Sequence, residues 1–180
     1  MENKITLRTK SKLVREQLDI NLISGDIVQK IRELSYYKMA KKIMLFYPLP
    51  HEINLLDLIK LDTNKKFFLP RINDKELDCC EYKNSDSLVC SKYKIFEPTT
   101  SAIDKNKLDI IIIPALCADK YFNRIGYGGG YYDRLLSDYA GVKILVIPDE
   151  LFYSKLPSES HDIPVDIIVT QSEILLSNSL

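Results

Sequence analysis

The sequence is poor in the residues that bind structural metals or form disulfides. It has two histidines, His51 and His161, and four cysteines, and no two cysteines have the two-residue spacer typical of zinc sites. The cysteines are Cys79, Cys80, Cys90 and Cys117. Because no secretory signal pattern accompanies them, we expect reduced thiols and a cytoplasmic location.

The chain also lacks an excess of charge and long apolar runs. Lys+Arg and Asp+Glu both number 25, so the positive footprint of a general nucleic-acid binder is absent. The run from Ile110 to Ile113 stops at Pro114, and charged residues occur throughout residues 1–15. We therefore expect no signal peptide, no membrane span and no nucleic-acid partner.

Alternating strand and helix patterns predict a three-layer α/β/α fold with a mostly parallel central sheet, and the length of residues 1–180 fits one domain. The predicted strands cover residues 43–47, 67–69, 109–114, 143–147 and 166–170. The predicted helices cover residues 4–18, a segment with Ser24 as its N-cap, residues 53–61 and the segment after Gly130. Residues 73–94 are expected to form a hairpin or edge strands, and the tail after Glu173 to pack loosely.

Glycine is scarce and unevenly distributed. Four of the six glycines fall between Asn123 and Leu136, at positions 126, 128, 129 and 130. Without a Cβ, such a run can adopt positive φ and turn several backbone N–H groups toward one anion. The helix predicted after Gly130 would add its first N–H groups, and Arg124 would bring a cation to the same phosphate.

The glycine run has a simpler alternative, a tight turn that packing alone requires. The run matches neither common nucleotide-binding fingerprint, because no Lys-Ser or Lys-Thr pair follows it and Tyr131 stands where G-x-G-x-x-G needs glycine. A phosphate site therefore depends on the charged residues nearby.

Four further charged residues are candidates for that site. Lys4 and Arg8 are one helical turn apart and share a face, although such pairs are commonly just a solvated surface. Asp133 would either interact with the dipole of its helix or hold Mg²⁺ beside the phosphates. Asp162 could supply a second acid or only shape a turn.

Aromatic residues and one acid complete the set of candidates. Tyr47, Tyr127, Tyr131 and Tyr132 suit a flat ligand ring, but they are also ordinary core residues. Glu52 could accept hydrogen bonds from an amino-heterocycle, or it could simply begin a helix. The sequence shows no Ser-His-Asp or Cys-His arrangement.

Together these residues resemble the 5-formyltetrahydrofolate cyclo-ligase family, also called methenyltetrahydrofolate synthetases. The match is most specific from Arg124 to Asp133 and extends over most of the chain. It includes Lys4 to Arg8, Tyr47 to Glu52, Leu69 to Arg71, Ile95 to Pro98, Asp109 to Pro114 and His161 to Thr170. The resemblance implies an ATP- and Mg²⁺-dependent closure of 5-formyltetrahydrofolate to 5,10-methenyltetrahydrofolate, with ADP and phosphate as the other products.

The resemblance also implies a role for each site residue. Arg124 and Asp133 would be catalytic, and Asp133 with Asp162 would hold Mg²⁺. ATP would contact Lys4, Arg8, Arg124, Ile125, Gly126, Tyr127, Gly128, Gly129, Gly130, Tyr131 and Tyr132. The folate would contact Tyr47, Glu52, Tyr127, Gly128, Gly129, Gly130 and Tyr131. The implied partners are small molecules, and the implied assembly is a monomer or weak dimer.

The segment before the glycines departs from the family's pattern, since Ala118 replaces a Phe and Phe122 replaces a Gly. A glycine with positive φ cannot be replaced in this way without strain. Two rival functions remain, and this departure would favour the first of them. One is a family-like protein that binds reduced folate or nucleotide without catalysis, and the other is a different enzyme on a similar scaffold, such as a sugar-phosphate isomerase.

Overall fold

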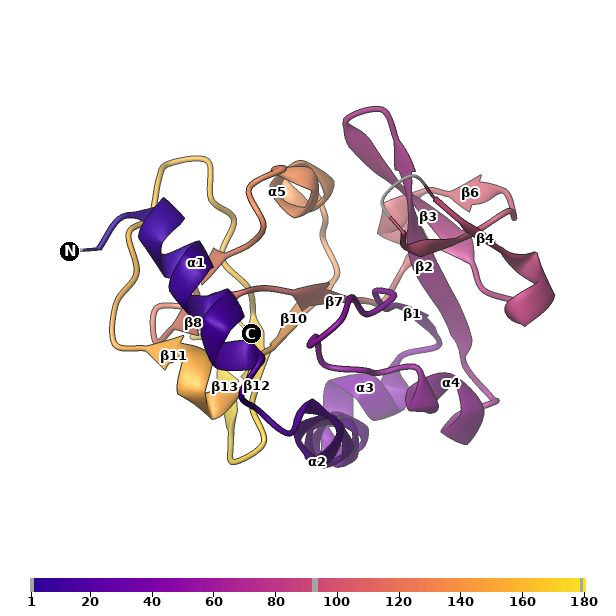
Figure 1. The fold of residues 1–180 in the computed structure, drawn as a ribbon. Coiled ribbons are helices and arrows are strands. Elements are labelled where there is room, and N and C mark those ends of the chain that lie inside the picture. Colours follow the sequence, from indigo (N-terminus) through magenta and orange to yellow (C-terminus); the bar gives the residue numbers. More distant parts are fainter. Residues whose placement is uncertain (1, 92–93, 179) are drawn as a thin grey trace.

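The computed structural model describes residues 2–91, 94–178 and 180, and Figure 1 shows how its elements are arranged. The α-helices are α1 (Lys4–Arg15), α2 (Ile20–Glu33), α3 (Ser35–Met39), α4 (Asp57–Leu61) and α5 (Tyr131–Leu136). Short 3₁₀ turns cover Ser85–Ser87, Lys105–Lys107 and Asp149–Leu151. No helix in the described part of the chain is both long and apolar enough to cross a membrane.

The strands form one large sheet and two small ones. The large sheet contains β1 (Lys42–Met44), β2 (Lys66–Asn73), β3 (Glu76–Glu81), β6 (Ala102–Ile103), β7 (Ile110–Pro114), β10 (Val142–Val146), β12 (Ile167–Val169) and β13 (Ile174–Leu176). One small sheet contains β8 (Cys117–Asp119), β9 (Arg124–Ile125) and β11 (Phe152–Tyr153), and the other contains β4 (Leu88–Cys90) and β5 (Phe96–Pro98).

The large sheet is parallel in its centre and antiparallel at its edges. Its order is β13-β12-β10-β7-β1-β2-β3-β6. The pairs from β12 through β2 are all parallel, whereas β13, β3 and β6 add antiparallel edges. The isoleucines of β7 are all buried, as expected for a strand covered on both faces. The predicted mostly parallel sheet is confirmed.

Alternate residues of each central strand enter two separate cores. Ile110 and Ile112 of β7 pack on the side that carries α2, α3 and α4, whereas Ile111 and Ile113 pack with apolar residues of α1 and α5. This alternation follows from the two-residue period of a strand. Figure 1 shows α2, α3 and α4 together on one side of the central strands and α5 on the other. The three-layer α/β/α prediction is thus confirmed.

Several predicted boundaries are wrong. Asp19, not Ser24, caps α2 by accepting a hydrogen bond from Leu22 N at 3.2 Å. Ser24 lies inside the helix, where its hydroxyl accepts from Asn54 N at 2.9 Å. The helix predicted for residues 53–61 begins only at α4, and the strand predicted for 43–47 ends at Met44. The tail is not loosely packed throughout, because β13 pairs with β12.

The topology creates a crevice between β1 and β7. From β1 the chain proceeds outward to β2 on one side, and from β7 it proceeds to β10 and β12 on the other. Open α/β sheets bind ligands at such a reversal, outside the carboxyl ends of the strands. The segments that leave these ends are residues 45–52 after β1 and residues 115–130 after β7, so they meet at this crevice.

Candidate active site

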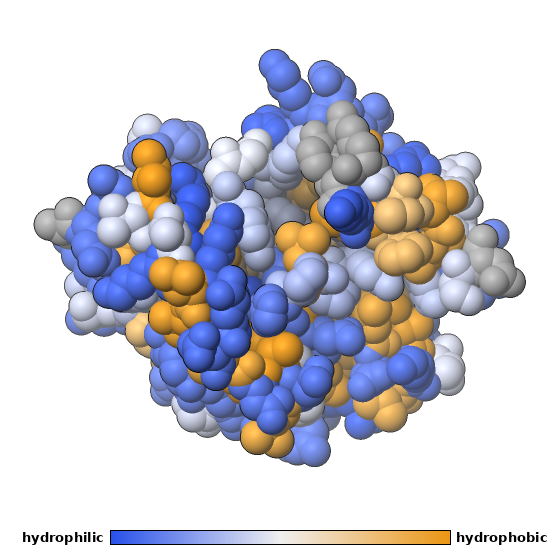
Figure 2. Space-filling model, viewed as in Figure 1, coloured by the Kyte–Doolittle hydropathy of each residue, from blue (hydrophilic) through white to orange (hydrophobic). Residues whose placement is uncertain are grey.

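A cavity of about 980 Å³ opens at the carboxyl ends of β1 and β7, and Figure 2 shows the surface hollowed on this side of the molecule. One arm of the cavity is rich in charge and the other in apolar and aromatic side chains. The charged arm contains Lys4, Arg8, Arg124, Asp133, Glu159, His161 and Asp162. The apolar arm contains Phe46, Tyr47, Leu49, Pro70, Ile72, Leu77 and Ile95, together with Glu52 and Glu97. The glycine run lies between them.

The glycine run has the backbone that its composition predicted. Gly128 has φ +103° and Gly130 has φ +68°, conformations that favour glycine. Arg8 packs against the run, and its Nε donates to the carbonyl of Gly126 at 2.9 Å. A Cβ on Gly128 would lie 3.3 Å from the Arg8 guanidinium carbon. The run is therefore shaped around an arginine of α1.

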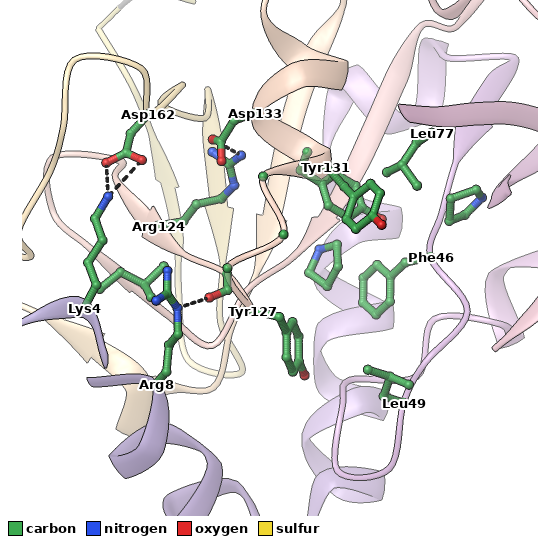
Figure 3. A pocket seen from close by; sticks show the side chains of 18 of the residues that line it. Lys4, Arg8, Phe46, Leu49, Leu77, Arg124, Tyr127, Tyr131, Asp133 and Asp162 are labelled. Carbon is green, nitrogen blue, oxygen red and sulfur yellow. Dashed lines mark hydrogen bonds and ion pairs between the residues drawn. The ribbon is translucent and has the colours of Figure 1, made fainter. Parts of the chain in front are cut away.

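Lys4 and Arg8 both reach the cavity from α1, as Figure 3 shows. The Nζ of Lys4 lies 2.7 Å from Oδ2 and 3.1 Å from Oδ1 of Asp162, and 3.4 Å from Glu159. Partial burial acts to raise the pKa of Asp162, but the hydrogen bonds from Lys4 and from the backbone of Glu159 outweigh it. The net effect is a pKa below the ordinary value of 3.8.

Arg124 is held inside the protein by an ion pair with Asp133. Its Nη2 lies 2.7 Å from Asp133 Oδ1, its Nη1 donates to the carbonyl of Ile163, and the residue is 8% exposed. Asp133 also accepts a long hydrogen bond, 3.5 Å, from Ile163 N, the residue after Asp162. The two predicted metal ligands therefore lie at one end of the cavity, each already paired with a cation (Figure 3).

A cluster of two carboxylates and one imidazole at this end includes two residues, Glu159 and His161, that sequence analysis did not assign. The ligand atoms of Glu159, His161 and Asp162 all lie within 4.8 Å of one another. Asp133 does not belong to that cluster, although it lies beside it. Carboxylate oxygens are the ligands that Mg²⁺ prefers, so the oxygens of Asp133, Glu159 and Asp162 fit the ion.

Glu52 and Tyr127 join across the cavity. The Tyr127 hydroxyl donates to Glu52 Oε1 at 2.6 Å, and Leu49 N donates to Oε2 at 2.8 Å. Burial, together with the Glu52 carboxylate, raises the pKa of Tyr127, so the phenol stays protonated. Lys12 lies 5.6 Å above the Tyr127 ring. Both oxygens of Glu52 thus have protein donors.

The remaining tyrosines and Ile125 line the cavity in different ways. The rings of Tyr47 and Phe96 pack at a 45° tilt with their centroids 5.2 Å apart, and Tyr131 lies under the guanidinium of Arg134, also at 5.2 Å. Tyr132 and Ile125 line the cavity and also pack against the core beneath α1 and α5. These two contribute shape more than polar contact.

A buried arginine that sequence analysis did not single out anchors the loop carrying Glu52. Arg15 is 4% exposed and donates to the carbonyls of His51, at 3.5 Å, and of Ala115. Burial lowers the pKa of its guanidinium, and the nearby Tyr127 and Glu52 act in the opposite direction. No pattern in the sequence separates this arginine from the other cations of α1.

The atypical segment before the glycines keeps an unusual backbone. Phe122 has φ +65°, the left-handed region in which a bulky side chain is strained. Its ring packs against the core that contains the buried Ala118. Asp119 is fully buried and accepts from the backbone N–H groups of Tyr121, Asn123 and Leu156 at 3.0, 3.0 and 2.8 Å. The turn is thus fixed by a carboxylate despite the loss of glycine.

Comparison with known proteins identifies relatives over nearly the whole chain. The chain is 31% identical over 147 residues to the 5-formyltetrahydrofolate cyclo-ligase of Escherichia coli K12, covering 76% of this chain and 81% of the relative. It is 29% identical over 180 residues to the enzyme of the same name from Haemophilus influenzae, covering 91% and 95%.

Solved structures give the same result. The NMR structure of Aquifex aeolicus 5,10-methenyltetrahydrofolate synthetase superimposes with a TM-score of 0.87 and 28% identity, covering 96% of this chain and 92% of that one. The synthetase of Mycoplasma pneumoniae shares the fold with a TM-score of 0.78, at 22% identity. The model of the 5-formyltetrahydrofolate cyclo-ligase family matches residues 4–171. This chain therefore belongs to the 5-formyltetrahydrofolate cyclo-ligase family.

Proposed function

We propose that the protein closes 5-formyltetrahydrofolate to 5,10-methenyltetrahydrofolate with ATP and Mg²⁺, releasing ADP and phosphate. The observation that carries this proposal is the two-armed cavity, in which a cluster of cations and carboxylates meets an apolar arm across a glycine run. A nucleotide triphosphate with its metal suits the first arm, and a flat pteridine ring suits the second. Family membership supports the same pairing of substrates.

The nucleotide is assigned to the charged arm. Lys4, Arg8 and Arg124 supply positive charge there, and the backbone between Gly126 and Gly130 adds N–H groups. Charge-assisted hydrogen bonds of this kind are the strong ones for phosphate. Ile125, Tyr131 and Tyr132 shape the surface behind them.

Asp133 and Asp162 are assigned to Mg²⁺, with Glu159 and His161 beside Asp162. When bound, the ion would neutralise phosphate charge. In the structure Lys4 forms an ion pair with Asp162, and Arg124 forms one with Asp133. If the two cations turn to the phosphates of ATP, the two carboxylates become available to Mg²⁺. Each cation then pairs with phosphate and each carboxylate with the metal.

The folate is assigned to the apolar arm. Tyr47, Glu52 and Tyr127 face this arm together with the glycine run and Tyr131. The Glu52–Tyr127 hydrogen bond fixes both side chains before substrate arrives. Preorganisation of this kind lowers the entropic cost of binding.

The reaction requires no protein nucleophile. The formyl oxygen attacks the γ-phosphorus and displaces ADP, N10 then adds to the activated formyl carbon and loses its proton, and phosphate leaves with the former formyl oxygen. Among the described residues that line the cavity there is no Ser, Thr or Cys. Positioning and charge neutralisation therefore carry the catalysis, as in other phosphoryl transfers.

The rival functions receive less support. A sugar-phosphate isomerase needs a phosphate site but has no use for the apolar arm with its aromatic side chains. A binder without catalysis would be favoured if the segment around Phe122 had collapsed, yet Asp119 holds that segment in a defined turn. All four cysteines are free, and we propose a cytoplasmic location on this basis.

The direct test mixes the protein with 5-formyltetrahydrofolate, Mg²⁺ and ATP and follows the methenyl-folate absorbance band, with an ATP-free control. Growth of the band only with ATP is the expected result. Growth without ATP would favour a different enzyme. If the band does not grow but calorimetry shows that the folded protein binds the folate, the function as a non-catalytic binder would be favoured.

A further inference from the structure

Glu97 is a buried carboxylate in the apolar arm to which neither sequence analysis nor the proposed mechanism gave a role. It lies in β5, between the exposed Phe96 and the buried Pro98, and it is only 7% exposed. It lines the same cavity as Glu52. The strand that carries it is tied to β2 by Arg71, which donates to the carbonyls of Pro98 and Thr100 at 3.4 and 2.9 Å.

Within the described residues, no hydrogen bond or ion pair reaches the Glu97 carboxylate. Arg71 acts on Glu97 through charge alone, because its guanidinium donates to Asp78 and to the two carbonyls of the β5 segment. Glu52 differs, since both of its oxygens accept protein hydrogen bonds. Glu97 is therefore the carboxylate of this arm whose two oxygens both lack a protein donor among the described residues.

The Glu97 carboxylate lines the cavity without a protein donor. Polar groups of buried residues are normally hydrogen-bonded, so the carboxylate of a buried residue that has no protein donor is open to donors from a ligand or from water. Such a group at the wall of a ligand cavity is explained if the ligand supplies the donors. N–H or O–H groups on a flat ring suit this arm, because its lining also includes the apolar side chains of Pro70, Ile72 and Leu77.

We infer that Glu97 binds the 2-amino-4-oxopyrimidine end of the substrate's pteridine ring and determines specificity for it. This inference rests on the proposed function. The exocyclic amino group and the adjacent ring N–H are two donors side by side, and a carboxylate offers two oxygens with matching spacing. Glu52 and Tyr127, already bonded to each other, then hold the ring from the side of the glycine run.

The test compares binding of 5-formyltetrahydrofolate with binding of its 2-desamino-2-methyl analogue by calorimetry, without ATP. Wild-type protein is expected to bind the analogue about tenfold to hundredfold more weakly, the range for lost hydrogen bonds to a charged group. Glu97→Gln keeps the shape of the side chain but removes its charge, and it is expected to lose most of that preference. Glu33→Gln, on the exposed face of α2, is the matched control and should bind both ligands as wild type does.

The outcomes separate this inference from the proposed function. Equal wild-type affinity for the two ligands would overturn the role of Glu97 without any variant, and the ring closure would stand. Glu97→Gln with unchanged preference would overturn it as well. Wild-type protein that binds neither ligand would contradict the proposed function and, with it, the role of Glu97. ATP affinity of Glu97→Gln should stay within about twofold of wild type, because the charged arm is intact.

Discussion

The Nζ of Lys4 lies 2.7 Å from Oδ2 of Asp162, across 158 positions of the sequence. Arg124 and Asp133 form a second pair at the same end of the cavity, also at 2.7 Å. Each pair joins a cation that we assign to phosphate with a carboxylate that we assign to Mg²⁺. Nucleotide and metal must therefore separate these pairs together, and each ligand should favour binding of the other.

Substitution of Lys4 by methionine tests this exchange. Lys4→Met leaves Asp162 without its cation, so Mn²⁺ alone should bind several-fold more tightly, while ATP should bind about tenfold more weakly for loss of one charge-assisted contact. Lys10→Met, which removes an exposed lysine of the same helix, is the control. Electron paramagnetic resonance of free Mn²⁺ gives the metal affinity. Unchanged Mn²⁺ affinity in Lys4→Met would show that the ion pair does not compete with metal.

The lowered pKa of Asp162 makes stability depend on pH. Asp162 holds its proton less readily in the folded than in the unfolded protein, so its contribution is present above pH 3.8 and is lost as pH falls through the lowered pKa. Because the pair is partly solvated, this contribution should not exceed about 1 kcal/mol. Urea unfolding of wild type and Asp162→Asn below pH 4 checks it. If the free energy of unfolding decreases equally in the two proteins as the pH falls, Asp162 makes no such contribution.

Gly128 is expected to be irreplaceable for two reasons. Gly128→Ala places a Cβ at φ +103° and 3.3 Å from the Arg8 guanidinium, so the free energy of unfolding should drop by about 1–3 kcal/mol and ATP should bind more weakly. Gly25→Ala is the matched control, because it lies inside α2 with nothing within 4 Å of its Cβ. That change should stabilise the protein by up to about 1 kcal/mol. Equal changes in the free energy of unfolding for Gly128→Ala and Gly25→Ala would contradict the positive φ and the close Arg8 contact at Gly128.

Asp119 should be the main support of the atypical turn. Asp119→Asn replaces one carboxylate oxygen with an amide nitrogen, which cannot accept the backbone N–H groups of Tyr121, Asn123 or Leu156. The free energy of unfolding should decrease by about 2–3 kcal/mol. Asp57→Asn on the surface of α4 should change it by less than about 0.5 kcal/mol. Thermal unfolding of both variants measures these changes. If Asp119→Asn lowers the free energy of unfolding no more than Asp57→Asn does, packing of Phe122 holds the turn instead.

Much of the fold was predictable from local patterns. The apolar runs gave the buried parallel strands because a strand covered on both faces needs apolar residues at consecutive positions. Ser24 was misassigned because its hydroxyl serves a tertiary contact, the N–H of Asn54, which no local rule reveals. Residues 53–56 carry apolar residues at helical spacing but pack as irregular chain before α4, since Ile53 and Leu55 both reach the core.

The sequence indicated which residues line the candidate site but not which of them form ion pairs with one another. Scarce glycines concentrated in one run indicated a close approach, and the approaching group proved to be Arg8. The pairs of Lys4 with Asp162 and of Arg124 with Asp133 depend on how α1, α5 and the loop before β12 pack together. Glu97 was missed because a single acid in a short strand looks like a surface residue until its burial is known.

The most direct test of the proposed chemistry follows one oxygen atom. If the formyl oxygen attacks the γ-phosphorus, 5-formyltetrahydrofolate labelled with ¹⁸O in the formyl group must pass that label to the released phosphate. ³¹P NMR resolves the isotopic shift of the phosphate while absorbance follows ring closure. The mechanism predicts one ¹⁸O in each phosphate formed. Ring closure with unlabelled phosphate would contradict it, because water and not the formyl oxygen would then have attacked the γ-phosphorus.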